Sequence, residues 1–149
     1  MIGELSKREM EAVLRSGIVA RLGCHAEGRT YVVPITYAYD GTSLIGHSAL
    51  GLKVDMMRQN PAVCVEVDQV DDPGHWRSVI AWGRYEELEG EAALEAMERL
   101  VARFESLALS ETSRPSHRMA EAYRSGEGYP DAVVYRIHLE AMTGRFERP

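Results

Sequence analysis

Residues 37–61, YAYDGTSLIGHSALGLKVDMMRQNP, join a tight turn, a strand, a glycine-containing corner and a short helix without a gap. The dipeptide Asp40-Gly41 is a strong hairpin signal, because both residues tolerate the backbone angles of a two-residue turn. It predicts that a strand over residues 29–39 pairs with a strand over residues 43–47. The segment therefore predicts a hairpin whose second strand leads directly into a helix.

The corner at residues 47–53, HSALGLK, has the composition of a phosphate-binding helix start. Ser48 is a favourable helix cap, Gly51 permits a close turn of the backbone, and Lys53 falls in or near the first helical turn. Unpaired N–H groups at a helix start attract anions, and a lysine adds a full positive charge, which would suit a dianionic phosphate monoester. An ordinary capped helix with a solvent-exposed lysine explains the same residues.

The length and composition are those of an ordinary globular protein. A chain of 149 residues is most economically a single domain, residues 1–149, with 45% hydrophobic and 27% charged residues. A net charge of -6 and an isoelectric point near 5.4 argue against non-specific nucleic-acid binding, which depends on clustered lysine and arginine. The charged N-terminus does not look like a signal peptide, and no run approaches the roughly 20 apolar residues of a membrane span. We therefore expect a cytoplasmic protein without a membrane partner.

The spacing of cysteine and histidine contains no metal-binding motif. Cys24 and Cys64 lie in strand-like segments without CxxC spacing, which indicates buried reduced thiols rather than a disulfide or a metal site. The five histidines are scattered without HxH or HxxxH spacing. We therefore expect no structural metal.

The remaining pattern is a meander of strands with helices inserted. Ser6 is expected to cap a helix over residues 5–16, and apolar residues at helical spacing predict a second helix over residues 91–104. A third helix over residues 115–123 would begin at a proline. Alternating or apolar runs predict further strands at residues 18–24, 62–68, 76–88 and 132–146. We expect a mainly β protein with peripheral helices, most simply a small antiparallel barrel.

Pro34 is unusual inside a predicted strand. Proline has no N–H group to donate to a neighbouring strand, so the VVPITYAY segment must lie at an edge, contain a bulge, or pair on one side only. Backbone groups next to Pro34 would then be free to face a ligand. An edge-strand proline that limits aggregation is the alternative explanation.

Four motifs follow one another along the chain: the PI.Y.YDG hairpin, the HSA.G.K corner, the NP.VC.EVD strand and the WRSV..WG strand. Together they resemble the pyridoxamine 5'-phosphate oxidase-like, FMN-binding split barrels, most closely the nitroimidazole-resistance-type subgroup. The resemblance spans nearly the whole chain. It implies a six-stranded antiparallel split barrel that forms a homodimer and binds FMN at the subunit interface, with two sites per dimer.

The resemblance also implies which residues hold the cofactor. Lys53, helped by Ser48, would bind the FMN phosphate, and Arg77 would add positive charge. Backbone groups of residues 33–36 would lie along the isoalloxazine ring, with His47 near it. The implied cofactor-binding residues are Val33, Pro34, Ile35, Thr36, His47, Ser48, Lys53, Arg77, Ser78, Val79 and Trp82. A hydrogen-bonded structural role for His47 and core or interface packing of Trp82 are the alternatives.

Two departures from the family argue against oxidation of vitamin B6 itself. Leu52-Lys53 stands where the authentic oxidases carry Arg-Lys, and the C-terminal RIHLEAMTGRFERP lacks their tryptophan and R-x-H-x-R motif. No catalytic acid, base or nucleophile stands out. The implied function is an FMN-dependent oxidoreductase that passes electrons from NAD(P)H to a small oxidised substrate, such as a nitroaromatic or a quinone. A non-catalytic protein that stores or senses a flavin, a deazaflavin or haem is the alternative.

Overall fold

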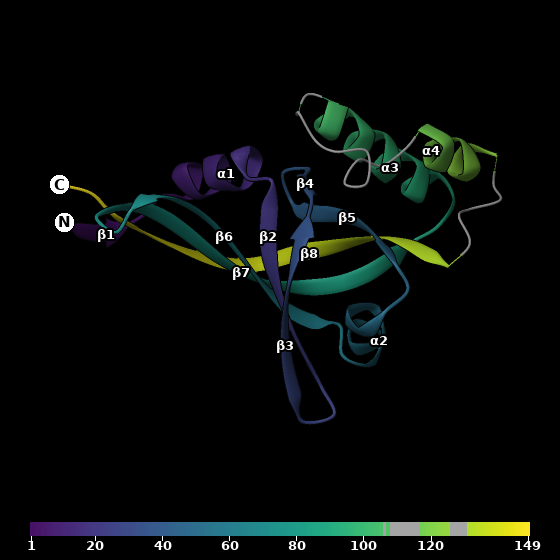
Figure 1. Ribbon diagram of the computed structural model, residues 1–149, viewed down its shortest axis with the longest axis horizontal. Coiled ribbons are helices and arrows are strands. Elements are labelled where there is room, and N and C mark those ends of the chain that lie inside the picture. The colour runs from purple at the N-terminus through teal and green to yellow at the C-terminus, as the bar shows by residue number, and fades with distance from the viewer. Residues whose placement is uncertain (106, 108–116, 126–130) are drawn as a thin grey trace.

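The computed structural model describes residues 1–105, 107, 117–125 and 131–149 (Figure 1). Within them the chain forms eight strands and four helices. In chain order these are β1 Ile2–Glu4, α1 Lys7–Ser16, β2 Val19–Ala26, β3 Arg29–Thr36, β4 Ala38–Tyr39, β5 Ser43–Ala49, α2 Leu52–Gln59, β6 Ala62–Asp72, β7 His75–Leu88, α3 Gly90–Glu105, α4 His117–Arg124 and β8 Ala132–Glu147.

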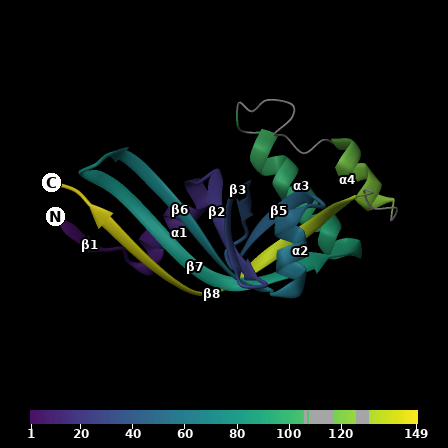
Figure 2. The same ribbon diagram turned by 60° about the horizontal axis from the view of Figure 1, so that its bottom comes forward.

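The strands form one strongly curved antiparallel sheet. Its order is β3-β2-β6-β7-β8-β5-β4, with β1 beside β8. The long strands β7 and β8 curve side by side through the middle of the molecule, and β2 and β3 project as a hairpin arm (Figures 1 and 2). Since β3 and β4 remain as edges, the sheet does not close. This architecture confirms the expected split barrel with peripheral helices.

The strand predicted over residues 29–39 is in fact two strands, and this prediction was wrong. β3 pairs with β2, whereas β4 pairs with β5 through Ala38↔Ile45 and Tyr39↔Leu44. The chain leaves one edge of the sheet at Tyr37 and joins the other. The Tyr37 side chain is buried, and its hydroxyl donates a 2.6 Å hydrogen bond to the carbonyl of Leu14 at the end of α1. The buried Tyr37 side chain therefore lies at the point where the predicted strand is divided into β3 and β4.

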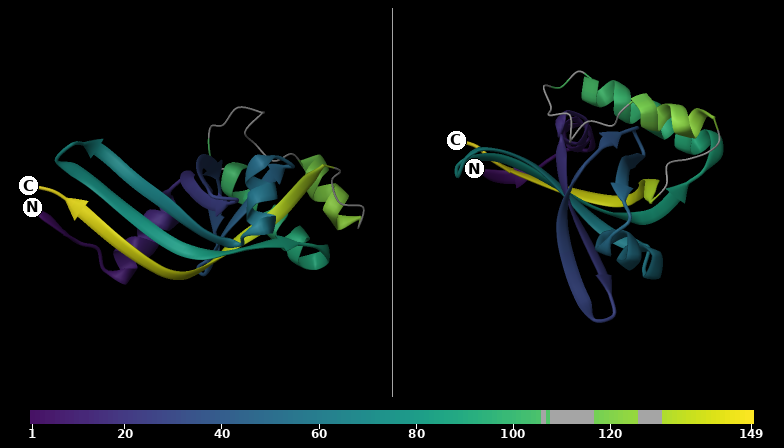
Figure 3. Two further views of the ribbon diagram at one scale, coloured as in Figure 1. Left: turned by 90° about the horizontal axis from the view of Figure 1, so that it is seen from below. Right: turned by 45° about the vertical axis from the view of Figure 1, so that its right-hand side comes forward.

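The two faces of the sheet carry separate apolar cores. The inner face, which bears Leu22, Val65 and Ala81, packs against α1 and α2. The outer face is covered at one end by α3, whose Met97 and Leu100 cluster with Val134 of β8. Figure 3 shows α3 and α4 together over this end of the sheet. The rest of the outer face carries no helix in the described part of the chain.

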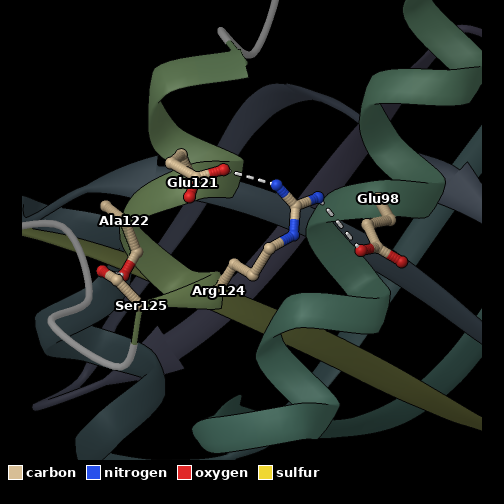
Figure 4. Close-up of polar contacts among 5 residues, drawn as sticks. All are labelled: Glu98, Glu121, Ala122, Arg124 and Ser125. Carbon is tan, nitrogen blue, oxygen red and sulfur yellow. Dashed lines mark hydrogen bonds and ion pairs between the residues drawn. The ribbon is translucent and has the colours of Figure 1, made fainter.

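The helix α4 is attached mainly to α3. Arg124 forms ion pairs with Glu121 in its own helix and with Glu98 of α3, the latter at 3.4 Å (Figure 4). Tyr123 packs against the α3 core. The expected helix start at residue 115 and the expected loop over residues 125–130 lie, except for Ser125, outside the described residues.

The sequence predicted the N-terminal cap of α1 correctly and that of α2 incorrectly. Ser6 caps α1 in a capping box with Glu9, as expected. The expected cap of α2 was wrong: Gly51 occupies the N-cap position without a side-chain hydrogen bond. Ser48 instead lies buried in β5 and donates its hydroxyl to the carbonyl of Ala49 at 2.7 Å. The strand continues through Ala49, and the N-cap of α2 falls at Gly51, three residues later than expected.

Candidate functional site

The outer face of the sheet leaves a broad apolar surface uncovered. Strand register places Val32, Gly23, Cys64, Trp82 and Ala141 in one row across five neighbouring strands. We call this surface the open face. Its large exposed apolar side chains are Val19, Val32, Val70, Ile80 and Trp82, with exposed fractions from 37% to 64%. Exposed apolar surface of this extent usually marks a binding or association surface.

A shallow hollow of about 650 Å³ lies in the open face. Gly23, Gly83, Cys64 and Trp82 line it together with a few polar side chains, which include His25, Thr30, Arg84 and Glu140. The size and the mixture of apolar surface with a few polar groups match those of small-molecule sites. Trp82, predicted as a cofactor contact, therefore lines a hollow that could take a planar ring.

A polar cluster interrupts the apolar surface of the open face. The Ser78 hydroxyl donates a 2.9 Å hydrogen bond to Glu66, and Arg21 forms a 3.5 Å ion pair with Asp68. Partial burial raises the pKa of Glu66, as does the neighbouring Asp68 carboxylate, while the Ser78 hydrogen bond opposes this shift. The sequence prediction missed Glu66. The sequence feature that could have identified Glu66 is the pair of acids at residues 66 and 68 on one face of an otherwise apolar strand.

The predicted phosphate corner presents a free cation. Lys53 is half-buried in the first turn of α2 and makes no hydrogen bond or ion pair with any residue that the structure describes. Its pKa is lowered because burial disfavours the charged ammonium. Gly51 provides no side chain to cap the helix, so the first N–H groups of α2 also lack a side-chain partner. This donor set fits a phosphate group.

Residues 33–36 run along the β3 edge of the sheet, as the proline predicted. Pro34, opposite Arg21, and Thr36, opposite Val19, belong to the outer face. Val33 and Ile35 point instead into the inner core, as does the buried Val79 of β7. An edge strand leaves alternate backbone groups unpaired. The side chains of Val33, Ile35 and Val79 therefore do not face the outer surface, and the backbone of Val79 is paired with both β6 and β8.

His47 lies on the outer face beneath the α3 core. It pairs across the strands with Val134, which belongs to that core, so both side chains lie on the same face. Its Nε2 atom is buried and has no hydrogen-bond partner among the described residues. Burial lowers the pKa of the imidazole. The structure therefore directs His47 toward α3, away from the inner core that contains α2.

Arg77 lies far from Lys53 within one chain. It lines a separate hollow of about 360 Å³ together with Glu9, Phe146 and Arg148. Ala62, which begins the strand after α2, pairs with Arg84. Arg77 lies seven residues before Arg84 in β7, which places it ~23 Å from Arg84 at the usual strand rise. One chain therefore does not bring Arg77 and Lys53 to a common phosphate.

The described residues contain no group of three or more histidine, cysteine or acidic side chains placed to hold a metal ion. None of their helices has the length and apolar character needed to cross a membrane. Both cysteines are free thiols, with Cys24 buried and Cys64 half-buried on the open face.

The fold and site define a split barrel with an open apolar face and a basic helix start. A family model described as pyridoxamine 5'-phosphate oxidase matches residues 6–146, and the chain belongs to this family. An uncharacterised protein of Rhizobium meliloti (strain 1021) is 40% identical over 84 residues. That match covers 56% of each chain, so the chain spans just over half the length of the curated relative.

Solved structures show the same fold over nearly the whole chain. A protein described as FAD-binding from Mesorhizobium loti is 32% identical, with a TM-score of 0.73 and 98% of each chain covered. A proposed 5-nitroimidazole antibiotic resistance protein from Bacteroides thetaiotaomicron is 22% identical, with the same TM-score. That match covers 98% of this chain and 87% of the other.

Proposed function

We propose that this protein binds a flavin phosphate and works as a homodimer with the cofactor at the subunit interface. The observation that carries the proposal is Lys53, a half-buried cation without a described partner at the uncapped start of α2. A phosphate would supply the missing negative charge and would accept hydrogen bonds from the helix N–H groups. Leu52, next to Lys53, provides no second charge.

The ring of the flavin is assigned to the surface formed by the β3 edge and the open face. Backbone groups next to Pro34 suit the polar edge of an isoalloxazine ring, and Trp82 offers a flat apolar contact. The family resemblance implies FMN, and the Mesorhizobium loti relative is described as FAD-binding. Both cofactors carry a phosphate on the ribityl chain, so the role assigned to Lys53 is the same for either.

A second copy of this chain is the proposed partner of the open face. The apolar side chains Val32, Ile80 and Trp82 need cover, and the same surface carries both the basic Arg21 and the acidic Glu66 and Asp68. A two-fold interface brings one patch against itself, which requires a patch that is complementary to itself. A surface with apolar side chains and both signs of charge meets this requirement.

The proposed activity is electron transfer through the flavin, from a nicotinamide donor to a small oxidised substrate such as a nitroaromatic or a quinone. The flavin supplies the redox chemistry when it is bound, and the protein holds the phosphate and excludes water from the ring. A non-catalytic flavin carrier is the second candidate. It is favoured by the orientation of His47, whose side chain turns toward the α3 core rather than toward Lys53.

An absorption spectrum of the freshly purified protein, with mass spectrometry of the released ligand, tests flavin binding and separates FMN from FAD. A colourless protein that also fails to quench FMN or FAD fluorescence on titration would refute the proposal. Steady-state oxidation of NADH or NADPH with a panel of nitroaromatic and quinone substrates then separates the two candidates. A carrier should show no turnover above that of free flavin.

A further inference from the structure

The carboxylates of Glu66 and Asp68 lie near the centre of the open face, among its apolar side chains. Glu66 stands opposite Ile80 on one side and Arg21 on the other, in the strand row that also contains Pro34. The Ser78 hydroxyl donates to Glu66 at 2.9 Å. The cluster therefore lies within the surface that a second copy would cover.

Of the two neighbouring carboxylates, Asp68 is the one that forms an ion pair with a basic side chain among the described residues. Arg21, from β2, forms its ion pair with Asp68 at 3.5 Å. From β7 Glu66 receives only the neutral Ser78 hydroxyl, and the next basic group in that direction is Arg145 of β8, opposite Ser78. Glu66 therefore has an acidic neighbour in Asp68, whereas the nearest cation pairs with that neighbour. Removal of water therefore disfavours the charged form of Glu66, which has no ion pair of its own among the described residues.

We propose that association of two copies through the open face is coupled to proton uptake at Glu66, so that the dimer is tighter at mildly acidic pH than at alkaline pH. This inference rests on the dimer proposed above. Covering the face removes water from the cluster, which favours the neutral form of Glu66. Asp68 retains its ion pair with Arg21.

The direction of the pH dependence follows from proton linkage. A carboxyl group whose pKa is higher in the dimer than in the monomer binds a proton when the dimer forms. Association is then favoured below the dimer pKa and weakens as the pH rises through it. The cluster would make the protein a reversible pH-sensitive dimer whose two flavin sites assemble and open together.

Sedimentation velocity of the protein as purified, at about pH 5.5 and about pH 8, tests the coupling. The dissociation constant of the dimer should rise by at least about tenfold between these two pH values, since each subunit would release a proton on separation. Glu66→Gln keeps the acceptor for Ser78 and cannot titrate, so its dimer should be tight at both pH values. Glu91→Gln, an exposed acid at the start of α3, is the matched control and should keep the wild-type dependence.

A second variant guards against a folding defect in Glu66→Gln. The Ser78 hydrogen bond favours the charged form of Glu66, so Ser78→Ala should move the midpoint of the pH dependence to higher pH. The coupling is overturned if the flavin-loaded dimer has the same dissociation constant at both pH values, or if it dissociates more readily at low pH. Either result leaves the proposed function standing. A flavin-loaded monomer at every pH overturns both the coupling and the proposed dimer. A protein without flavin contradicts the proposed function on its own.

Discussion

The hydroxyl of Tyr37 donates a 2.6 Å hydrogen bond to the backbone carbonyl of Leu14, and both residues are buried. This contact joins the C-terminal end of α1 to the point where the chain passes from β3 to β4. Gly17 lies directly beside it, since a Cβ at this position would come within 2.3 Å of the Tyr37 hydroxyl. Tyr37 therefore ties together the helix, the strand break and the inner core.

Tyr37→Phe should lower the free energy of unfolding by about 1 to 2 kcal/mol, because it leaves the Leu14 carbonyl buried without its donor. Urea denaturation measures the change. Tyr31→Phe is the matched control, because the Tyr31 side chain is only half-buried and no hydrogen bond of its hydroxyl is seen among the described residues. Equal stability of Tyr37→Phe and the wild type would show that the contact contributes nothing.

Gly83→Ala should destabilise the protein far more than Gly23→Ala, although both glycines line the same hollow. A Cβ on Gly83 would lie 2.3 Å from the backbone carbonyl oxygen of His138, next to the register shift between β7 and β8. A Cβ on Gly23 would make only an ordinary contact, 3.6 Å from the Cys64 carbonyl. We expect a loss of about 1 to 3 kcal/mol or more for Gly83→Ala and under about 1 kcal/mol for Gly23→Ala. Thermal unfolding that ranks the two variants equally would contradict the strand register.

Lys53→Ala should weaken the binding of FMN by about 1.5 to 3 kcal/mol, roughly ten- to hundredfold, through loss of a charge-assisted contact. Riboflavin lacks the phosphate, so its affinity should stay the same. The other lysine of the chain, the exposed Lys7, provides the control variant Lys7→Ala. Fluorescence titration measures all of these affinities. An equal loss of FMN and riboflavin binding would mean that Lys53 supports the fold of the site rather than the phosphate.

Trp82→Asp should separate the proposed dimer into monomers. It places a charge in the middle of the open face, where the wild-type side chain is 46% exposed in the single chain. An anchor residue of this type typically contributes at least about 2 kcal/mol, or roughly thirtyfold in the dissociation constant. Sedimentation velocity measures the effect, with Ala102→Asp on the exposed side of α3 as the control. A Trp82→Asp protein that stays as dimeric as the control would place the interface elsewhere.

His47 should make the stability of the protein depend on pH. Burial lowers its pKa, so the unfolded chain binds a proton more readily than the folded chain. Its contribution is present above the ordinary histidine pKa of about 6.5 and is lost as the pH falls through the folded value. The wild type should therefore lose more stability than His47→Leu between about pH 7.5 and about pH 5.5, as measured by urea denaturation. Equal losses would show that His47 can be protonated where it lies.

Local signals predicted most of the elements correctly. Ser6 and Glu9 cap α1, alternation along residues 18–24 predicts the buried face of β2, and Asp40-Gly41 pairs Tyr39 with Leu44. Pro34 lies in an edge strand, one of the positions open to a residue without an N–H group. Each of these features depends on residues close together in the sequence, so a single chain is enough to predict them.

The sequence by itself therefore determined a β-rich chain with capped helices, a hairpin, an edge proline and a lysine at a helix start. Only the tertiary structure decided which strands pair, that the chain changes edges at Tyr37, and that Ser48 remains in β5. The same holds for the orientation of His47 toward α3 and for the contact between Glu66 and Ser78. These features depend on side chains that lie far apart in the sequence and meet only when the two cores pack. No local propensity reports which distant partner buries a given residue.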